Sequence, residues 1–157
     1  TIPAARSKNG EEHAVPLSPA ARDVLDSVHR IKGRAGLVFS TNGETPVSGF
    51  TRAAVRLRAT MAEIAAEDAG EPVEIAAFTL HDLRRTAVTG MARIGFPPHV
   101  VEAVINHKSG TRRGVAGIYN RNSYAAEKKQ ALEAWARLVV DLVEARADNV
   151  VRIERAR

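Results

Sequence analysis

Helix start and stop signals recur along this chain and constrain its fold more than any other feature. A hydroxyl residue followed by proline, as in Ser18-Pro19, is a typical helix start, and glycine is a typical stop because it adopts left-handed backbone without strain. These signals predict helices from Ser18 to Gly33 and over about 48–68, 79–94, 97–107 and 124–147. The chain is therefore expected to be mostly helical.

The predicted helices carry apolar stripes at helical spacing, which mark the faces expected to be buried. The stripes comprise Ala20, Val24, Val28 and Ile31 in the first helix, Phe50, Ala54, Leu57, Met61 and Ile64 or Ala65 in the second, and Leu132, Trp135, Val139 and Leu142 in the last.

Two short stretches favour extended structure. Asn9-Gly10 is a strong hairpin-turn signal between the extended residues 1–4 and 13–17, and residues 37–40 form a short strand candidate. Together these features predict an α+β fold that is mostly α-helical, with a small antiparallel β-sheet or hairpin near the N-terminus. We expect one domain over residues 1–157, with 148–157 as a flexible basic tail.

Composition narrows the function classes. Hydrophobic residues make up 45% of the 157 residues, which is enough for a folded core, and no apolar run approaches the roughly 20 residues that span a bilayer. The absence of cysteine excludes disulfide scaffolds, thiolate zinc sites and cysteine nucleophiles. The net charge of +5 moderately favours a polyanionic partner.

Three segments contain residues suited to phosphate chemistry. His81 and Arg84 share one face at the start of a predicted helix, where free N–H groups and the helix dipole favour an anion, although an arginine there can instead pair with Asp82. His107 lies at a predicted helix C-terminus, where it can equally be a capping residue. Tyr119 can act as a nucleophile only if cations stabilise its phenolate, and an isolated tyrosine is more often a core residue.

These pieces, in this order, resemble the catalytic domain of the tyrosine recombinases, the phage-integrase family. The matching text is "TLHDLRRTAVTGMARIG" around His81 and Arg84, "VEAVINHKSG" around His107 and "VAGIYNR" around Tyr119. The segment "IPAARSKNGEEHAVPLS" is similar to the hairpin that precedes them, with its lysine, Lys8, at the turn. The likeness covers nearly the whole chain and is strongest to integrases of genomic islands and P4-like phages.

The resemblance implies a role for each matched residue. Tyr119 would attack a DNA phosphate to form a 3′-phosphotyrosine, and Arg84 would clamp the non-bridging oxygens. His81 would assist proton transfer at the tyrosine, His107 would hydrogen-bond the phosphate, and Lys8 would protonate the departing 5′ oxygen. No metal or other cofactor is implied. The implied partners are double-stranded DNA at attachment sites and further copies in a synaptic tetramer, with no membrane and with a cytoplasmic location in a bacterium.

Three departures from the family pattern matter. The family has a further catalytic arginine upstream of the hairpin, and neither Arg6 nor Arg22 fits its place, so the chain is expected to be a C-terminal fragment impaired in cleavage. Asn106 stands where many relatives have glycine, which we interpret as a feature of the branch. Tyr124 lies five residues after Tyr119 and competes with it for the role of nucleophile, but Tyr119 matches the motif better.

Basic residues spread over the predicted helices and one loop are candidates for DNA contact. The candidates are Arg52, Arg56, Arg85, Lys108, Arg112 and Arg113. Each of them can instead be a solvated charge on the surface. Three other functions stay open at this point, namely a type IB topoisomerase, a metal-independent nuclease using Lys8, His81 and His107, and a non-catalytic DNA-binding module.

Overall fold

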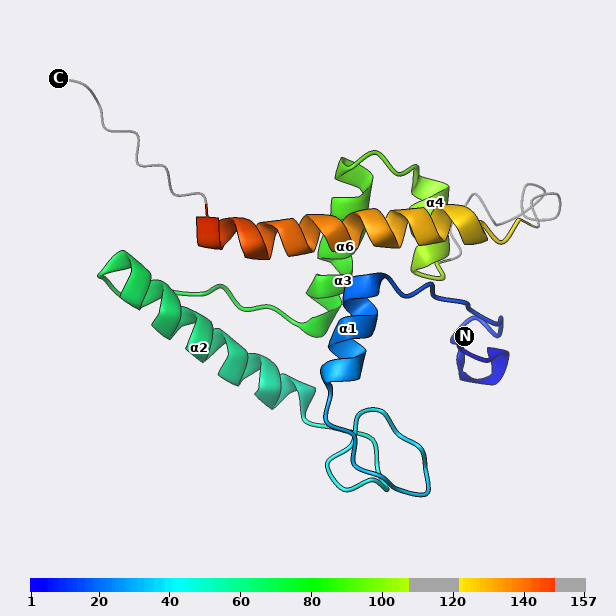
Figure 1. The fold of residues 1–157 in the computed structure, drawn as a ribbon, viewed down its shortest axis with the longest axis horizontal. Coiled ribbons are helices and arrows are strands. Elements are labelled where there is room, and N and C mark those ends of the chain that lie inside the picture. The colour runs from blue at the N-terminus through cyan, green and yellow to red at the C-terminus, as the bar shows by residue number, and fades with distance from the viewer. Residues whose placement is uncertain (108–121, 149–157) are drawn as a thin grey trace. The chain divides into compact units, whose positions relative to one another are not determined.

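A computed structural model describes residues 1–107 and 122–148 of the chain (Figure 1). Its elements are a short 3-10 turn, η1 (Ala4–Arg6), and the helices α1 (Pro19–Ser27), α2 (Phe50–Ala69), α3 (Leu80–Arg93), α4 (Pro98–Val104) and α6 (Ala125–Asp148). The prediction of a mostly helical chain is confirmed. No β-strand is found in the described ranges, so the predicted sheet is not confirmed. An isolated antiparallel bridge joins Ile2 and His13.

The chain divides into two compact units. Unit 1 comprises Thr1–Ser27 and Val88–Arg157, and unit 2 comprises Val28–Ala87. The division falls inside α3, which is helical on both sides of it.

The core of unit 1 lies where α4 contacts the N-terminal half of α6. Its buried hydrophobic residues are small or medium-sized and come from three helices: Met91, Val100, Val101, Ala103, Val104 and Ala131. Two buried polar side chains tie the N-terminal segment to this core. The imidazole of His13 hydrogen-bonds the Val104 carbonyl at 3.0 Å, and the Lys128 ammonium donates to the Ala14 carbonyl at 3.0 Å.

Most predicted helix ends are close to the observed ones because caps act locally. Gly70 and Gly95 both adopt left-handed backbone, with φ of 72° and 97°, directly after α2 and near the end of α3. At the second site the N–H groups of Gly95 and Phe96 donate to the carbonyls of Ala92 and Met91, each at 3.1 Å. This pair of bonds satisfies carbonyls that the end of a helix leaves open.

Three predicted features differ from the structure. The first helix ends at Ser27 rather than near Gly33, and the Ser27 hydroxyl donates to the Val24 carbonyl at 2.8 Å, a local bond that competes with the helix ladder. Gly49, at φ 80°, is the N-cap of α2, where the sequence predicts Ser48. Residues 37–40 form no strand and lead into a loop held by the Asn42 carboxamide, which accepts from the Thr45 N–H at 2.9 Å.

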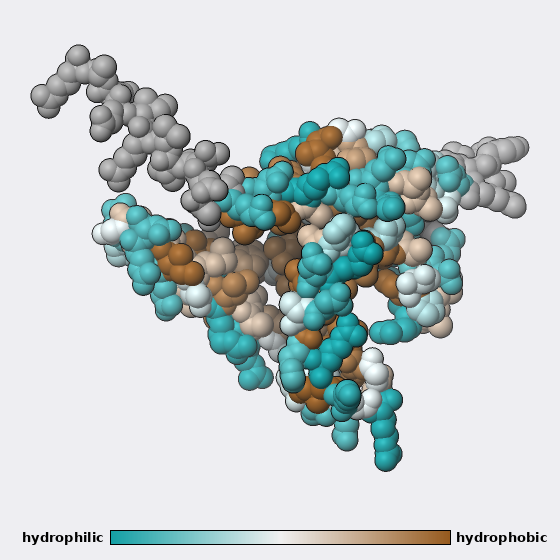
Figure 2. Space-filling view, viewed as in Figure 1, coloured by the Kyte–Doolittle hydropathy of each residue, from teal (hydrophilic) through white to brown (hydrophobic). Residues whose placement is uncertain are grey.

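The apolar stripe of α2 is largely exposed, contrary to expectation. Phe50 and Leu57 are each 52% exposed, and Ile64 is 55% exposed. Figure 2 shows hydrophobic residues interleaved with hydrophilic ones on the visible surface. In residues 28–87, α2 is the only complete helix, so no second whole helix of unit 2 covers this face.

The stripe of α6 is buried only in part. Leu132 and Trp135 are half-buried, whereas Leu142 is 61% exposed. The helix contacts α4 and α1, and the buried residues described on it, Lys128 and Ala131, lie in its N-terminal half.

Candidate functional site

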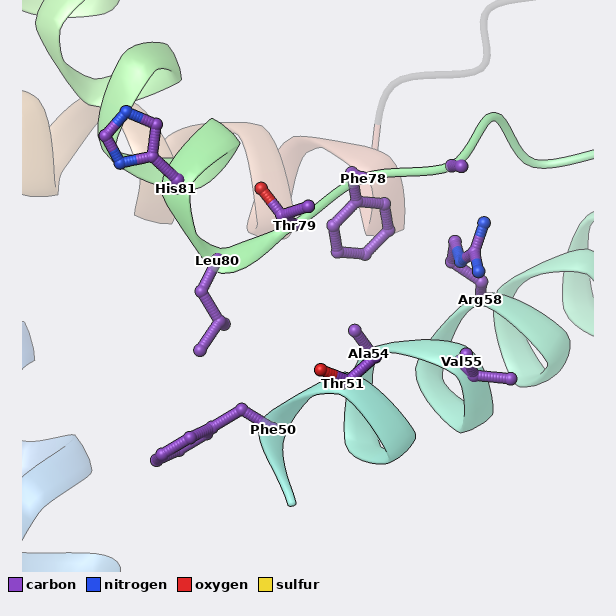
Figure 3. Close-up of a pocket in the computed structure, with 10 residues that line it drawn as sticks. Phe50, Thr51, Ala54, Val55, Arg58, Phe78, Thr79, Leu80 and His81 are labelled. Carbon is purple, nitrogen blue, oxygen red and sulfur yellow. The ribbon is translucent and has the colours of Figure 1, made fainter. Parts of the chain in front are cut away.

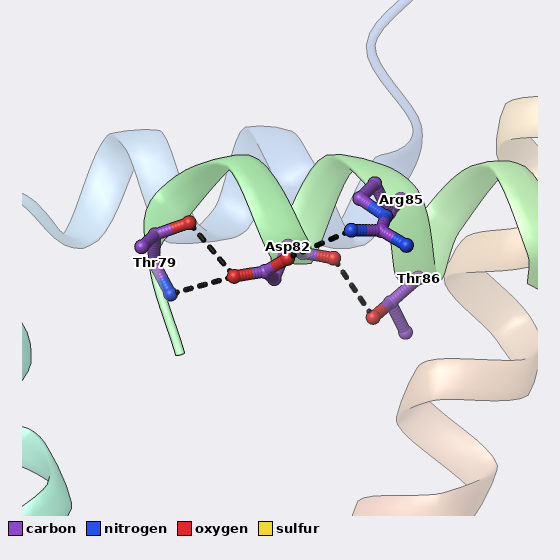
Figure 4. A network of polar contacts seen from close by, with 4 residues as sticks. All are labelled: Thr79, Asp82, Arg85 and Thr86. Atoms are coloured by element: carbon purple, nitrogen blue, oxygen red, sulfur yellow. Dashed lines mark hydrogen bonds and ion pairs between the residues drawn. The ribbon is translucent and has the colours of Figure 1, made fainter. Parts of the chain in front are cut away.

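The start of α3 is organised around Asp82 (Figure 4). Its carboxylate accepts hydrogen bonds from the Thr79 N–H at 2.9 Å and from the Thr79 hydroxyl at 2.8 Å. These two bonds, with smaller contributions from the charges of Arg85 and His81, hold the pKa of the Asp82 carboxyl below its ordinary value. The sequence Thr79-Leu80-His81-Asp82 has the form of a capping box with aspartate in place of glutamate. The bond from the Thr79 N–H to the Asp82 carboxylate is one half of such a box, and the helix begins at Leu80.

This cap places His81 and Arg84 in the first two turns of α3, three residues apart on one face. Both side chains are exposed. Arg85 forms an ion pair with Asp82 at 3.6 Å, so the pairing that the sequence left open involves this second arginine. The cations at this helix start are thereby partly balanced by a carboxylate, whose negative charge interacts favourably with the helix dipole there.

A cavity of about 460 Å³ lies next to this helix start, within unit 2 (Figure 3). Its wall is mainly apolar and comes from the first turns of α2 and from residues 77–81, including Phe50, Phe78 and Leu80. His81 also borders the cavity, but its ring points away from the α2 side chains in Figure 3. The Nε of Arg58, on the cavity wall, is buried and has no hydrogen-bond partner among the described residues.

Lys8 occupies a tight turn in unit 1. The turn comprises residues 7–10 and closes with a hydrogen bond from the Gly10 N–H to the Ser7 carbonyl at 3.0 Å. Gly10 takes φ 72°, a value that costs glycine little. The Lys8 side chain is exposed at the second position of the turn.

His107 follows the C-terminus of α4. The chain leaves this helix through Asn106, which takes left-handed backbone at φ 54°. The His107 N–H donates to the Glu102 carbonyl at 2.9 Å, and the Asn106 N–H donates to the Ala103 carbonyl at 3.4 Å. This is the bond pattern of a Schellman cap, and it leaves the His107 side chain exposed at the negative end of the helix dipole.

The turn around Lys8 and the end of α4 are joined by a pair of carboxamides. The Asn9 Nδ2 donates to the Asn106 Oδ1 at 2.8 Å, although the two residues are 97 positions apart. From the sequence, Asn9 is expected only to form a turn, and Asn106 is interpreted only as a feature of the family branch. Asparagine in place of glycine at position 106 was a signal that the side chain has a role, but no residue near it in the sequence identifies Asn9 as its partner.

The five predicted catalytic residues are therefore only partly assembled by the described structure. Lys8 and His107 belong to unit 1 and flank one contact, while His81 and Arg84 share the start of α3 in unit 2. Tyr119 lies outside the described residues. The convergence of all five on one phosphate stays a prediction.

Tyr124, which competes with Tyr119 for the role of nucleophile, lies among the described residues. The half-buried Tyr124 ring lies against His99 on α4, with ring centroids 5.0 Å apart. Its carbonyl accepts the Lys128 N–H at 2.8 Å and so contributes to the first turn of α6. Tyr124 thus packs at a helix start.

The predicted DNA contacts divide into two sets. Arg52 and Arg56 are exposed on α2, and Arg85 is exposed next to Asp82. Lys108, Arg112 and Arg113 lie outside the described residues. Among the described residues, no group of three or more His, Asp or Glu is placed to hold a metal ion. No described helix combines the length and hydropathy of a membrane span.

The chain belongs to the phage integrase family. The profile of that family matches residues 1–126, a range that includes both the Lys8 turn and Tyr119. The chain is 31% identical over 142 residues to the prophage integrase IntA of Escherichia coli strain K12, an alignment that covers 88% of this chain and 30% of that relative. No solved structure matches the chain.

Proposed function

We propose that this chain is the catalytic domain of a site-specific tyrosine recombinase, which breaks and rejoins DNA through a 3′-phosphotyrosine. The observation that carries the proposal is the family match over residues 1–126, which contains every one of the five matched catalytic positions. The partners would be double-stranded DNA at attachment sites and further copies of the protein in a synaptic tetramer. The outcome would be integration or excision of a mobile element.

The chemistry follows from the side chains. The Tyr119 oxygen attacks phosphorus and its proton passes to His81, while the bond from phosphorus to the 5′ oxygen breaks and that oxygen takes a proton from Lys8. Arg84 matches two non-bridging oxygens with its planar guanidinium, and His107 donates a further hydrogen bond. The reverse steps rejoin the strand. Since the phosphotyrosine conserves the energy of the broken ester bond, no nucleotide hydrolysis is needed.

Three observations in the described residues support this scheme. The start of α3 presents His81 and Arg84 together on an exposed face. The exposed Lys8 and His107 flank the Asn9–Asn106 contact. Tyr124 packs on His99 at the start of α6, which favours Tyr119 as the nucleophile.

The test is covalent trapping on a nicked suicide DNA, with the protein in its full natural length. We expect an adduct that resists denaturation, that is lost in Tyr119→Phe and that persists in Tyr124→Phe, because only the first removes the attacking oxygen. Loss in Tyr124→Phe alone would reverse the assignment of the nucleophile.

The same experiment separates the other functions. Cleavage without any covalent adduct would indicate a nuclease, and salt-sensitive binding without cleavage would indicate a non-catalytic DNA-binding module. A covalent adduct together with relaxation of supercoils, but with no joining of two duplexes, would indicate a topoisomerase.

A further inference from the structure

We propose that Asn9 and Asn106 are positioning residues, which hold the Lys8 turn against the His107 end of α4 so that the Lys8 and His107 side chains address one phosphate. The inference rests on the proposed recombinase function and adds two residues to it. Neither Asn9 nor Asn106 touches the reacting atoms in this scheme, and both act through their neighbours in the chain.

The contact is a small network with several bonds. Besides the bond of 2.8 Å from Asn9 to Asn106, the Asn106 Nδ2 donates to the Ser7 hydroxyl at 3.0 Å and to the Asn9 Oδ1 at 3.3 Å. The Ser7 hydroxyl in turn donates to the Asn9 Oδ1 at 2.7 Å. All three residues are half-buried, so these bonds are partly shielded from water and hold the turn more firmly than exposed ones would.

The backbone explains why asparagine is suited to position 106. The cap of α4 needs left-handed backbone there, and asparagine is the residue other than glycine that accepts it most readily. Glycine would serve the cap equally well but has no side chain. The carboxamide is therefore not needed by the helix, and within residues 1–107 and 122–148 its bonds lead only to the Lys8 turn.

The contact between Asn9 and Asn106 matters because each of them is next in the chain to a predicted catalytic residue. Lys8 precedes Asn9 and His107 follows Asn106, and the side chains of both are exposed. A lysine side chain is long and has many rotamers, so an unanchored turn would spread its ammonium over a wide volume. Fixing the turn on the element that carries His107 limits this spread, and a misplacement of about 1 Å can cost about 100-fold in rate.

Removal of the carboxamide should leave the fold intact. The N-terminal segment has other anchors on unit 1, namely the His13 imidazole on the Val104 carbonyl and the Lys128 ammonium on the Ala14 carbonyl. Asn106→Gly also retains the left-handed cap. We therefore expect its thermal unfolding to stay close to that of the unmodified protein.

The test compares two DNA substrates, again with the protein in its full natural length. One carries the ordinary phosphodiester, and the other has sulfur in place of the 5′ bridging oxygen. A thiolate leaves without a proton, so the second substrate does not need Lys8 as an acid. We expect Asn106→Gly to slow adduct formation about 10- to 100-fold on the ordinary substrate and to have little effect on the sulfur substrate.

The matched variants sharpen the comparison. Lys8→Ala should show the same pattern more strongly because it removes the acid itself. Asn42→Gly, which deletes a carboxamide from the loop of unit 2, should leave the rates on both substrates unchanged. In the double variant with Asn9→Ala, the slowing should be smaller than the product of the two single effects, because both changes break the bonds between Asn9 and Asn106.

The outcomes separate the two proposals. Equal slowing on both substrates, no slowing, or slowing that multiplies in the double variant would overturn the positioning role while leaving the recombinase function in place. Failure of the unmodified protein to form an adduct with either substrate would overturn the recombinase function, and the positioning role with it.

Discussion

Asp82 links three features of the candidate site. Its carboxylate caps α3 through Thr79, pairs with Arg85, and keeps a negative charge in the turn that carries His81 and Arg84. Because this carboxyl is hydrogen-bonded in its ionised form, its pKa is lowered in the folded state. The stabilising effect is therefore present above the ordinary carboxyl pKa of about 4 and is lost as the pH falls through the lower value of the folded state.

Asp82→Asn should lower the midpoint of thermal unfolding at pH 7, since the neutral amide is a weaker acceptor for the Thr79 N–H. The difference from the unmodified protein should shrink as the pH falls below about 4, where the carboxylate itself becomes protonated. Scans across this pH range check the expectation. Asp23→Asn, which removes the same charge within α1 rather than at a helix start, is the control. A deficit for Asp82→Asn that did not change with pH would contradict the argument.

At the scale of elements, the crossing of α3 and α6 depends on one glycine. A Cβ added at Gly90 would overlap the six-membered ring of Trp135, so the close approach of the two helices requires hydrogen at this position. The sequence does not identify Gly90 as a contact between helices. A glycine inside a helical pattern indicates only that the helix is locally less stable. The half-buried Trp135 therefore packs on the α3 backbone at Gly90, and this contact fixes how α6 lies against α3 within unit 1.

Gly90→Ala should lower the free energy of unfolding by about 1–3 kcal/mol, the usual effect of overpacking, although alanine is the better helix former by about 1 kcal/mol. Chemical denaturation measures the change. In a Trp135→Leu background the obstructing ring is gone, and there Gly90→Ala should be neutral or stabilising. A stabilising effect in the unmodified background would show that the helices do not meet here.

At the scale of the whole molecule, most of the net charge of +5 belongs to unit 1, and unit 2 contributes +1. The exposed Arg52 and Arg56 on α2 are candidates for phosphate contact that form no ion pair with another described residue. Each phosphate that a protein neutralises steepens the dependence of binding on salt by about 0.9 in the slope of log affinity against log salt. The slope therefore reports how many phosphates a face neutralises.

Replacing Arg52 and Arg56 by alanine should weaken DNA binding at low salt and reduce the magnitude of this slope by about 0.9 for each phosphate that is no longer neutralised. Titrations at several salt concentrations check this. Lys129→Ala removes one charge from α6, where Lys129 pairs with Glu133 at 3.9 Å, and should leave the slope unchanged. Equal changes in both variants would mean that only net charge matters.

The sequence alone predicted the features that depend on neighbouring residues. The ends of α2 and α3 near Gly70 and Gly95 and the capping contact of Asp82 on Thr79 follow from bonds within one turn. The family motifs are likewise short and ordered along the chain, so they could be recognised without coordinates, and the profile match confirms the membership.

Tertiary structure decided what depends on residues far apart. The sequence did not predict that the α2 stripe is exposed, since burial depends on which elements face each helix. The Asn9–Asn106 contact spans 97 positions, and no local pattern pairs two carboxamides across that separation. The sequence determined where the helices begin and which residues carry charge, because these are local properties. Only the fold determined that the Lys8 turn and the His107 end of α4 meet, because that contact brings together two segments that are far apart in the sequence.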